Sequence, residues 1–172
     1  MMVYLIGMPA AGKTSIGKQL AKKANFTFLD LDEVISAKEE ISIQQLFREK
    51  GESYFRETES KYLKEVSQTK ENTILSLGGG TPCFYNNMDV ILSSGMVFYI
   101  NAPDYVIISR IIRGVTKRPL FAGLNEDELR DKISQLVKER EPFYLKAHQK
   151  IDTKTRSKKD IVEEIFSYIQ KG

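Results

Sequence analysis

Residues 7–14 have the types and the spacing that phosphate binding requires. They read GMPAAGKT and fit the pattern G-x-x-x-x-G-K-[ST], between an apolar run and a segment with helical spacing. Lys13 would reach the β- and γ-phosphates of a nucleotide, and the Thr14 hydroxyl would ligate Mg²⁺. The positive end of the following helix would help the loop to bind phosphate. The residues expected to face phosphate oxygens are Ala10, Ala11, Gly12, Lys13, Thr14 and Ser15. The alternative is a glycine-rich turn with a chance lysine.

A pair of aspartates follows the next apolar segment. Residues 26–29 are predicted as a strand, and Asp30 and Asp32 come directly after it. Alternation along a strand would place both carboxylates beside the phosphate loop and Leu31 in the core, at the sheet edge where ligands bind. Two carboxylates there suit a water-mediated Mg²⁺ contact and a base or anchor for a substrate hydroxyl. The alternative is an acid-rich helix N-terminus, which the helix dipole favours.

Residues 33–70 are predicted to form a helical insert that contains one unusual cation. Ser42 and Gln45 form a capping box for a first helix, Gly51 ends it, and a second helix follows. Arg56 lies near the start of that second helix, where a positive charge opposes the helix dipole. A carboxylate ligand would explain its place there, and a solvated surface arginine explains it equally well.

Three consecutive glycines follow the predicted strand at residues 73–77. Gly78, Gly79 and Gly80 allow the backbone to approach a ligand closely and to expose several amides. A flexible connector is the alternative, but a connector seldom follows the end of a buried strand so abruptly. The run therefore indicates a second place where the backbone meets a ligand.

A basic segment further along the chain indicates a mobile lid at about residues 112–124. Gly114 and Gly123 bracket it, and the cations that gather there are Arg110, Arg113, Lys117 and Arg118. A basic lid suits triphosphate chemistry, because the charge that develops on a transferred phosphoryl group needs cations and the exclusion of water. A plain solvated basic loop is the alternative, and the phosphate loop favours the lid.

The elements that must position these residues alternate between strands and helices. Strands are predicted at residues 3–6, 26–29, 73–77, 96–100 and 148–151. Helices are predicted at 13–24, twice within 33–70, at 86–94, 104–113 and 126–139, and after Ser157. The alternation predicts one three-layer α/β domain over residues 1–172, with a five-stranded parallel sheet, helices on both faces, the helical insert and the lid.

Composition narrows the classes of protein and partner. A chain of 172 residues is long enough for one domain with a real core, and its net charge of +3 gives no reason to expect nucleic acid. The single cysteine, Cys83, excludes an internal disulfide and suits a reducing compartment. No apolar run approaches membrane-spanning length, and the first one leads straight into the phosphate loop. We expect a cytoplasmic monomer with no nucleic-acid or membrane partner.

Several motifs occur in a specific order along nearly the whole chain. They are GMPAAGKTSIGKQLA, FLDLDEVI, GESYFRETE, ILSLGGGTP, KRPLFAG, REPFY and IDT. Many families share the phosphate loop, but LSLGGG together with FR-x-x-E, D-x-D and R-x-P-x-Y is much more specific. In this combination the chain resembles the shikimate kinase family, within the nucleoside-monophosphate-kinase-like group of P-loop kinases.

This resemblance implies transfer of the ATP γ-phosphoryl group to the 3-hydroxyl of shikimate, with Mg²⁺, in chorismate and aromatic amino-acid synthesis. It implies that Asp32 holds and orients the reacting hydroxyl, with the role of base left open, and that Asp30 joins Thr14 at the metal. It also implies that Arg56 and Arg140 pair with the shikimate carboxylate, a bidentate task that suits arginine. The remaining implied roles are backbone amides of Gly78, Gly79 and Gly80 at the substrate, Lys13 and Arg118 at the transferring phosphoryl group, and Arg110 and Arg156 near adenine.

The chain departs from the family pattern in three places, and two rivals stay open. Ala10 stands where the family usually has a further glycine, residues 111–116 do not align cleanly, and Lys158 falls near where some members have a proline against adenine. One rival is a sister kinase: a gluconate kinase would not be expected to keep LSLGGG with FR-x-x-E, and a nucleotide kinase should carry a base pocket that the sequence does not show. The other is a non-catalytic ATP-binding module, which would be expected to lose Lys13, Asp32 or Arg118.

Overall fold

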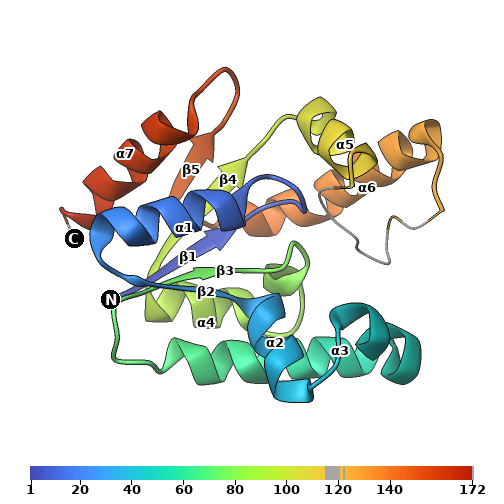
Figure 1. The fold of residues 1–172 in the computed structure, drawn as a ribbon, viewed down its shortest axis with the longest axis horizontal. Coiled ribbons are helices and arrows are strands. Elements are labelled where there is room, and N and C mark those ends of the chain that lie inside the picture. The colour runs from blue at the N-terminus through green and yellow to red at the C-terminus, as the bar shows by residue number, and fades with distance from the viewer. Residues whose placement is uncertain (115–120, 122, 172) are drawn as a thin grey trace.

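The computed structural model describes residues 1–114, 121 and 123–171, and it shows a parallel sheet between two helical layers (Figure 1). The strands are β1 (Met2–Ile6), β2 (Thr27–Asp30), β3 (Thr73–Ser76), β4 (Met96–Asn101) and β5 (Gln149–Asp152). They pair in the order β2-β3-β1-β4-β5, and every pairing is parallel. The predicted five-stranded parallel sheet is therefore confirmed.

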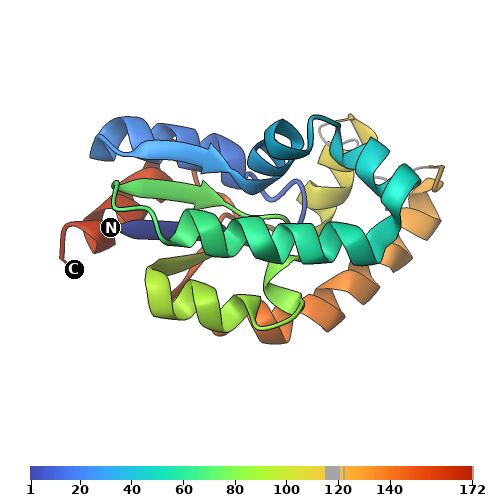
Figure 2. The ribbon, with the colours of Figure 1, turned by 90° about the horizontal axis from the view of Figure 1, so that it is seen from below.

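Helices cover both faces of this sheet. They are α1 (Lys13–Ala24), α2 (Leu31–Glu39), α3 (Ile43–Ser67), the short 3-10 helix η1 (Thr81–Cys83), α4 (Asn87–Ser94), α5 (Asp104–Ile112), α6 (Glu126–Tyr144) and α7 (Lys158–Ile169). Helices α1 and α7 pack together on one face, and α4 and α6 lie on the opposite one (Figure 2). None of the helices in the described chain has the length and the apolar character that crossing a bilayer requires.

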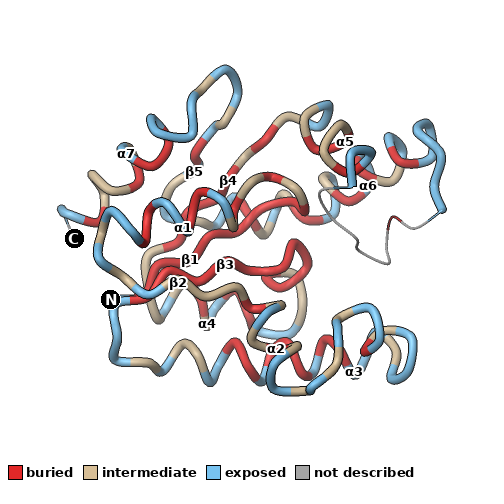
Figure 3. Tube along the Cα trace, in the orientation of Figure 1, coloured by how far each residue is buried: buried red, intermediate tan, exposed pale blue. Residues whose placement is uncertain are grey.

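The buried strands bring three loops to one edge of the sheet. All five residues of β1 are buried, because helices cover both faces, and Figure 3 shows the buried residues concentrated on the central strands. Ser76 of β3 pairs with Leu5 of β1 on one side and with Asp30 of β2 on the other. The loops that follow β1, β2 and β3 therefore start side by side, which is where ligands bind in open parallel sheets.

The two aspartates reach the predicted edge of the sheet, but through a helix start and not through a continued strand. Asp30 is the last residue of β2 and the N-cap of α2, and its Oδ1 accepts a hydrogen bond from the Asp32 amide at 3.1 Å. Leu31 already belongs to α2, so strand alternation does not apply to Asp32. The reasoning from strand alternation was wrong, because Asp30 caps a helix that starts at the next residue, and the alternative of an acid-rich helix N-terminus is confirmed. Leu31 is nevertheless buried, and both carboxylates remain at the carboxyl edge of the sheet.

Local signals in the helical regions were mostly confirmed, with one exception at α6. The capping box of Ser42 with Gln45 is formed, and Gly51 leaves helical geometry, with φ 80° and ψ 175°, so α3 is bent there. Helix α6 was predicted to end at about Glu139, but it continues to Tyr144 through Pro142. A proline in a last turn removes one hydrogen bond, and here the packing of the helix end outweighs that loss.

Candidate active site

The loop between β1 and α1 holds its lysine inside the turn. Lys13 Nζ donates hydrogen bonds to the carbonyl oxygens of Gly7 and Met8, both at 2.8 Å, and Lys13 is only 8% exposed. Gly12 is the N-cap of α1, with φ 104°, and no side chain caps the helix. The amides at the start of α1 and the lysine therefore favour an anion at the same place.

Ala10 adopts a backbone conformation that suits glycine. Its φ is 59°, in the left-handed region, which costs a residue with a Cβ about 1–2 kcal/mol. Arg110 of α5 donates from Nη1 to the Ala10 carbonyl oxygen at 2.8 Å and so helps to hold this conformation. The Ala11 amide was expected to face phosphate, but it donates to the Met8 carbonyl oxygen at 3.2 Å and closes a turn within the loop.

The two predicted metal-site residues contact each other. The Thr14 hydroxyl donates to Asp30 Oδ2 at 2.9 Å, which joins the start of α1 to the end of β2. Within the described residues, no group of three or more histidine, cysteine, aspartate or glutamate side chains could hold a metal ion. A hydroxyl and a single nearby carboxylate fit a hard cation such as Mg²⁺, which keeps several waters and takes its other ligands from nucleotide phosphates.

The three glycines after β3 form a turn against which the other site residues pack, and we call Gly78, Gly79 and Gly80 the glycine turn. A Cβ on Gly78 would lie 2.9 Å from Glu59 Oε1 and 3.5 Å from Asp32 Oδ1. On Gly79 it would lie 2.7 Å from Pro9 Cδ and 3.0 Å from Arg140 Nη1, and on Gly80 it would lie 2.9 Å from both terminal nitrogens of Arg56. The turn therefore joins the predicted acceptor site to the phosphate loop.

Arg56 is held by a buried carboxylate and by aromatic rings. Its Nη1 donates to Glu59 Oε2 at 2.8 Å, and its Nη2 and Nε contact Glu52 at 3.2 and 3.3 Å. The Phe84 ring centroid lies 4.2 Å from the guanidinium carbon. Glu59 is fully buried and also accepts from the Thr81 hydroxyl. Burial raises the pKa of Glu59, and the charge of Arg56 opposes that rise.

Arg140 lies in the last turns of α6, and it is only 8% exposed. Four residues later on the same helix face, the fully buried Tyr144 donates from its hydroxyl to the Gly79 carbonyl oxygen. Cys83 is half-buried in this region. Burial raises the pKa of the Cys83 thiol to about 11, although the charges of Arg140 and Arg56 lower it, so the thiol is protonated at neutral pH.

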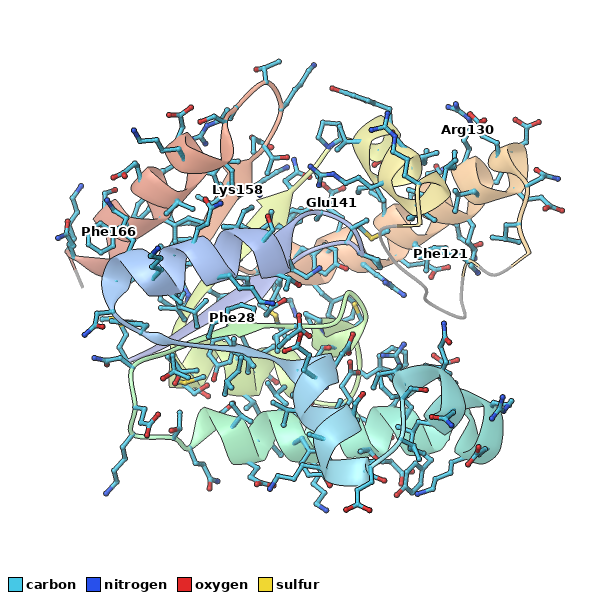
Figure 4. All side chains as sticks on the ribbon, in the orientation of Figure 1. Phe28, Phe121, Arg130, Glu141, Lys158 and Phe166 are labelled. Atoms are coloured by element: carbon cyan, nitrogen blue, oxygen red, sulfur yellow. The ribbon has the colours of Figure 1, made fainter. Side chains whose placement is uncertain are left out.

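The remaining predicted nucleotide residues meet at a hollow beside the phosphate loop. Its lining includes the loop residues Ala11, Gly12 and Ser15, together with Arg110, Arg156 and Lys158. Arg156 pairs with Glu164 and donates to the Asp152 carbonyl oxygen at 3.3 Å, so its side chain is fixed beside the hollow. Lys158 starts α7, where Figure 4 labels it. Arg118 and most of the predicted lid lie outside the described residues.

Comparison with known proteins decides the family. The family model described as "Shikimate kinase" matches residues 9–170. The chain belongs to the shikimate kinase family. Among its relatives, a shikimate kinase of Phocaeicola vulgatus is 40% identical over 145 residues, which are 84% of this chain and 82% of the relative.

Solved structures of shikimate kinases have the same fold. The enzyme of Bacteroides thetaiotaomicron has a TM-score of 0.92 at 34% identity, with 99% of this chain and 98% of that chain covered. A shikimate kinase of Acinetobacter baumannii in complex with shikimate has a TM-score of 0.90 at 31% identity, with coverages of 99% and 93%. Shikimate kinases are ATP-using phosphotransferases that act on shikimate, and this chain is one of that family.

Sequence reasoning assigned no role to three residues that the structure places at this candidate site. Glu59 and Tyr144 belong to the motifs FR-x-x-E and R-x-P-x-Y, but their contacts with Thr81 and Gly79 span 22 and 65 positions. Phe84 follows the glycine turn and carries no local signal of its contact with Arg56. The spacing of three from Arg56 to Glu59, and of four from Arg140 to Tyr144, could have indicated shared helix faces.

Proposed function

We propose that this chain transfers the γ-phosphoryl group of ATP to the 3-hydroxyl of shikimate, giving shikimate 3-phosphate and ADP in chorismate and aromatic amino-acid synthesis. The observation that carries this proposal is the glycine turn, against which Asp32, Arg56, Arg140 and Pro9 of the phosphate loop all pack. Direct transfer requires that the two substrates be held next to each other in a reactive orientation. The contact of Pro9 with Gly79 supports such an arrangement.

The acceptor half of the site suits a hydroxylated carboxylic acid. Arg56 and Arg140 come from different helices and are both buried, and two guanidinium groups in such a place suit a carboxylate. In the proposed reaction Asp32 orients the 3-hydroxyl and receives its proton as the oxygen attacks the γ-phosphorus. The bond from that phosphorus to the β–γ bridging oxygen breaks, and ADP leaves with the bonding electrons. Amides of the glycine turn donate to the bound acid.

The donor half is built on the phosphate loop. Lys13 and Arg118 are proposed to stabilise the charge on the transferring group; the assignment of Arg118 rests on the KRPLFAG motif alone. Thr14 and Asp30 would hold one Mg²⁺, which neutralises charge on the phosphates when it is bound. The other residues proposed to bind the nucleotide are Ala10, Ala11, Gly12, Ser15, Arg110 and Arg156.

The organisation around this reaction is also part of the proposal. Residues 33–70, which include most of α2 and all of α3, would form the acceptor-binding insert, and residues 112–124 would close as a lid. We further infer a single-domain monomer in the cytoplasm, with ATP and shikimate as its partners and no nucleic-acid or membrane partner. The small net charge and the single cysteine support this inference.

The proposal is tested by measuring ADP release with ATP and Mg²⁺ in the presence of shikimate, gluconate or nucleoside monophosphates. We expect turnover with shikimate alone, its loss on chelation of the metal, and its recovery with added Mg²⁺. Asp32→Asn should abolish turnover while Asp89→Asn, an exposed change on α4, should leave it intact. Preference for another acceptor would identify a sister kinase, and full activity in Asp32→Asn would refute the role of Asp32.

A further inference from the structure

The peptide bond between Gly79 and Gly80 lies where its orientation matters. A trans peptide is planar, so the Gly79 carbonyl and the Gly80 amide point in opposite directions. Glycines on both sides place little steric restriction on rotation of this unit about its flanking bonds. The local sequence alone therefore does not fix which side of the turn receives the Gly80 amide.

Tyr144 supplies the restraint that the turn lacks. Its hydroxyl donates to the Gly79 carbonyl oxygen at 2.5 Å and also lies 3.8 Å from Met8 Sδ. A hydroxyl carries a single hydrogen, and a carbonyl oxygen is a better acceptor than a thioether, so the bond is to Gly79. Tyr144, which lies 65 positions further along the chain, thus holds the Gly79 carbonyl toward α6.

The tyrosine is itself held rigidly. Tyr144 is fully buried, and its ring packs on Tyr99 of β4, with the ring centroids 5.0 Å apart. Burial raises the pKa of the Tyr144 hydroxyl well above its usual value, and the charge of Arg140 beside it opposes that rise. The hydroxyl is therefore protonated throughout the working pH range and is available as a donor at all times.

The amides of Gly80 and Thr81 differ in their hydrogen bonding. The Thr81 amide donates to the Gly78 carbonyl oxygen at 3.1 Å, whereas no acceptor for the Gly80 amide is found among the described residues. Because the Gly79 carbonyl points toward Tyr144, the Gly80 amide points away from it. Gly80 also packs against Arg56, which the proposed function places at the acceptor carboxylate.

We propose that Tyr144 is a positioning residue that fixes the Gly79–Gly80 peptide, so that the Gly80 amide donates a hydrogen bond to the acceptor substrate. The inference rests on the proposed function, because it assumes that shikimate binds at the glycine turn. Tyr144 does not touch the substrate and acts through the peptide alone. It stabilises one of two orientations that the glycines would otherwise both allow.

The kinetic test is Tyr144→Phe, with Tyr99→Phe as its matched control. The first change removes the hydroxyl that holds Gly79, and the second removes a hydroxyl that bonds to Asn101 at 3.0 Å in the stacked partner ring. We expect Tyr144→Phe to raise the KM for shikimate about tenfold, the effect of one well-placed hydrogen bond, with the KM for ATP unchanged. Tyr99→Phe should change neither KM by more than about twofold.

The outcomes separate this inference from the proposed function. Wild-type protein that does not use shikimate refutes the proposed function, whereas wild-type turnover with an unchanged shikimate KM in Tyr144→Phe refutes the role of Tyr144. If Tyr144 were merely structural, its replacement would lower the urea midpoint and the active fraction, and therefore the apparent kcat, but it would change neither the KM for shikimate nor the KM for ATP. A rise in the shikimate KM alone therefore supports positioning.

A second measurement keeps the inference testable if Tyr144→Phe does not fold. The chain has 11 glycines, so protein labelled with ¹⁵N-glycine gives a sparse amide spectrum in which Gly80 can be assigned. We expect the Gly80 amide of the wild-type protein to shift on addition of shikimate and to gain protection from hydrogen exchange. A Gly80 amide that does not respond to saturating shikimate overturns the inference.

Discussion

Replacing Arg56 by methionine should leave the buried carboxylate of Glu59 without its cation, and the resulting loss of stability should depend on pH. Glu59 is fully buried, and the Arg56 guanidinium at 2.8 Å is the cation that stabilises its carboxylate. Removing one partner of a buried ion pair costs about 3–5 kcal/mol, because the other charge loses its compensation. We therefore expect Arg56→Met to lower the free energy of unfolding by about that amount near neutral pH.

The pH dependence of this loss follows from the pKa of Glu59. Burial raises that pKa, and removal of Arg56 raises it further, so the folded variant holds a proton that the unfolded chain releases. Stability is then fully present below the unfolded pKa and is lost as the pH rises toward the folded pKa. Between about pH 5.5 and 7.5 the free energy of unfolding of the variant should fall by at most roughly 2.7 kcal/mol, which is 1.36 kcal/mol for each of two pH units.

A second substitution tests the cause. Arg56→Met with Glu59→Gln replaces the carboxylate by a neutral amide whose oxygen can still accept from Thr81, so it should recover most of the stability and lose the pH dependence. The KM for shikimate should stay high in both variants, because the carboxylate partner is missing. Urea unfolding followed by far-UV circular dichroism at both pH values measures the effect. A loss below about 1 kcal/mol, or an equal loss at both pH values, would refute a buried, ionised Glu59.

Two further predictions concern single residues of the site. Alkylation of Cys83 by iodoacetamide at neutral pH should be about 100-fold slower in the folded than in the denatured protein. The reason is that a pKa of about 11, against the ordinary 9.0, lowers the thiolate fraction by that factor. Equal alkylation rates, measured by mass spectrometry, would contradict this prediction. Ala10→Gly should stabilise the fold by about 0.5 kcal/mol in urea unfolding, since relief of the left-handed backbone exceeds the added chain entropy, and a loss of about 1 kcal/mol would show that the Ala10 methyl packing matters more.

Features that depend on neighbouring residues could be predicted from the sequence. The capping box predicted at Ser42 was found, and Asn125 and Ser157 cap their helices in the same local way, because each cap is formed by a side chain and an amide three residues away. The alternation of strands and helices was enough to predict the sheet, although not the order of its strands. The bend at Gly51 was also visible, because few residues other than glycine adopt its backbone angles.

Two kinds of feature could not be predicted in this way: those in which two local structures compete for the same residues, and those that depend on contacts between residues far apart in the sequence. Asp30 could continue the strand or cap a helix, and only the fold decides that it does the latter. Pro142 indicated the end of α6, but the buried contacts of Tyr144 extend the helix beyond it. Likewise, the motifs include Glu59 without showing its contact with Thr81, because that contact forms only when α3 packs against the glycine turn.

The crowding around the glycine turn limits how this site can change under selection. A methyl group at Gly78, Gly79 or Gly80 would come within 2.9 Å of Glu59, Pro9 or Arg56, and each of these neighbours belongs to the proposed site or contacts it. A bulkier residue would therefore require a second substitution that itself impairs the enzyme. An inhibitor that mimics shikimate and takes most of its contacts from this turn would leave few single mutations by which resistance could arise without loss of activity.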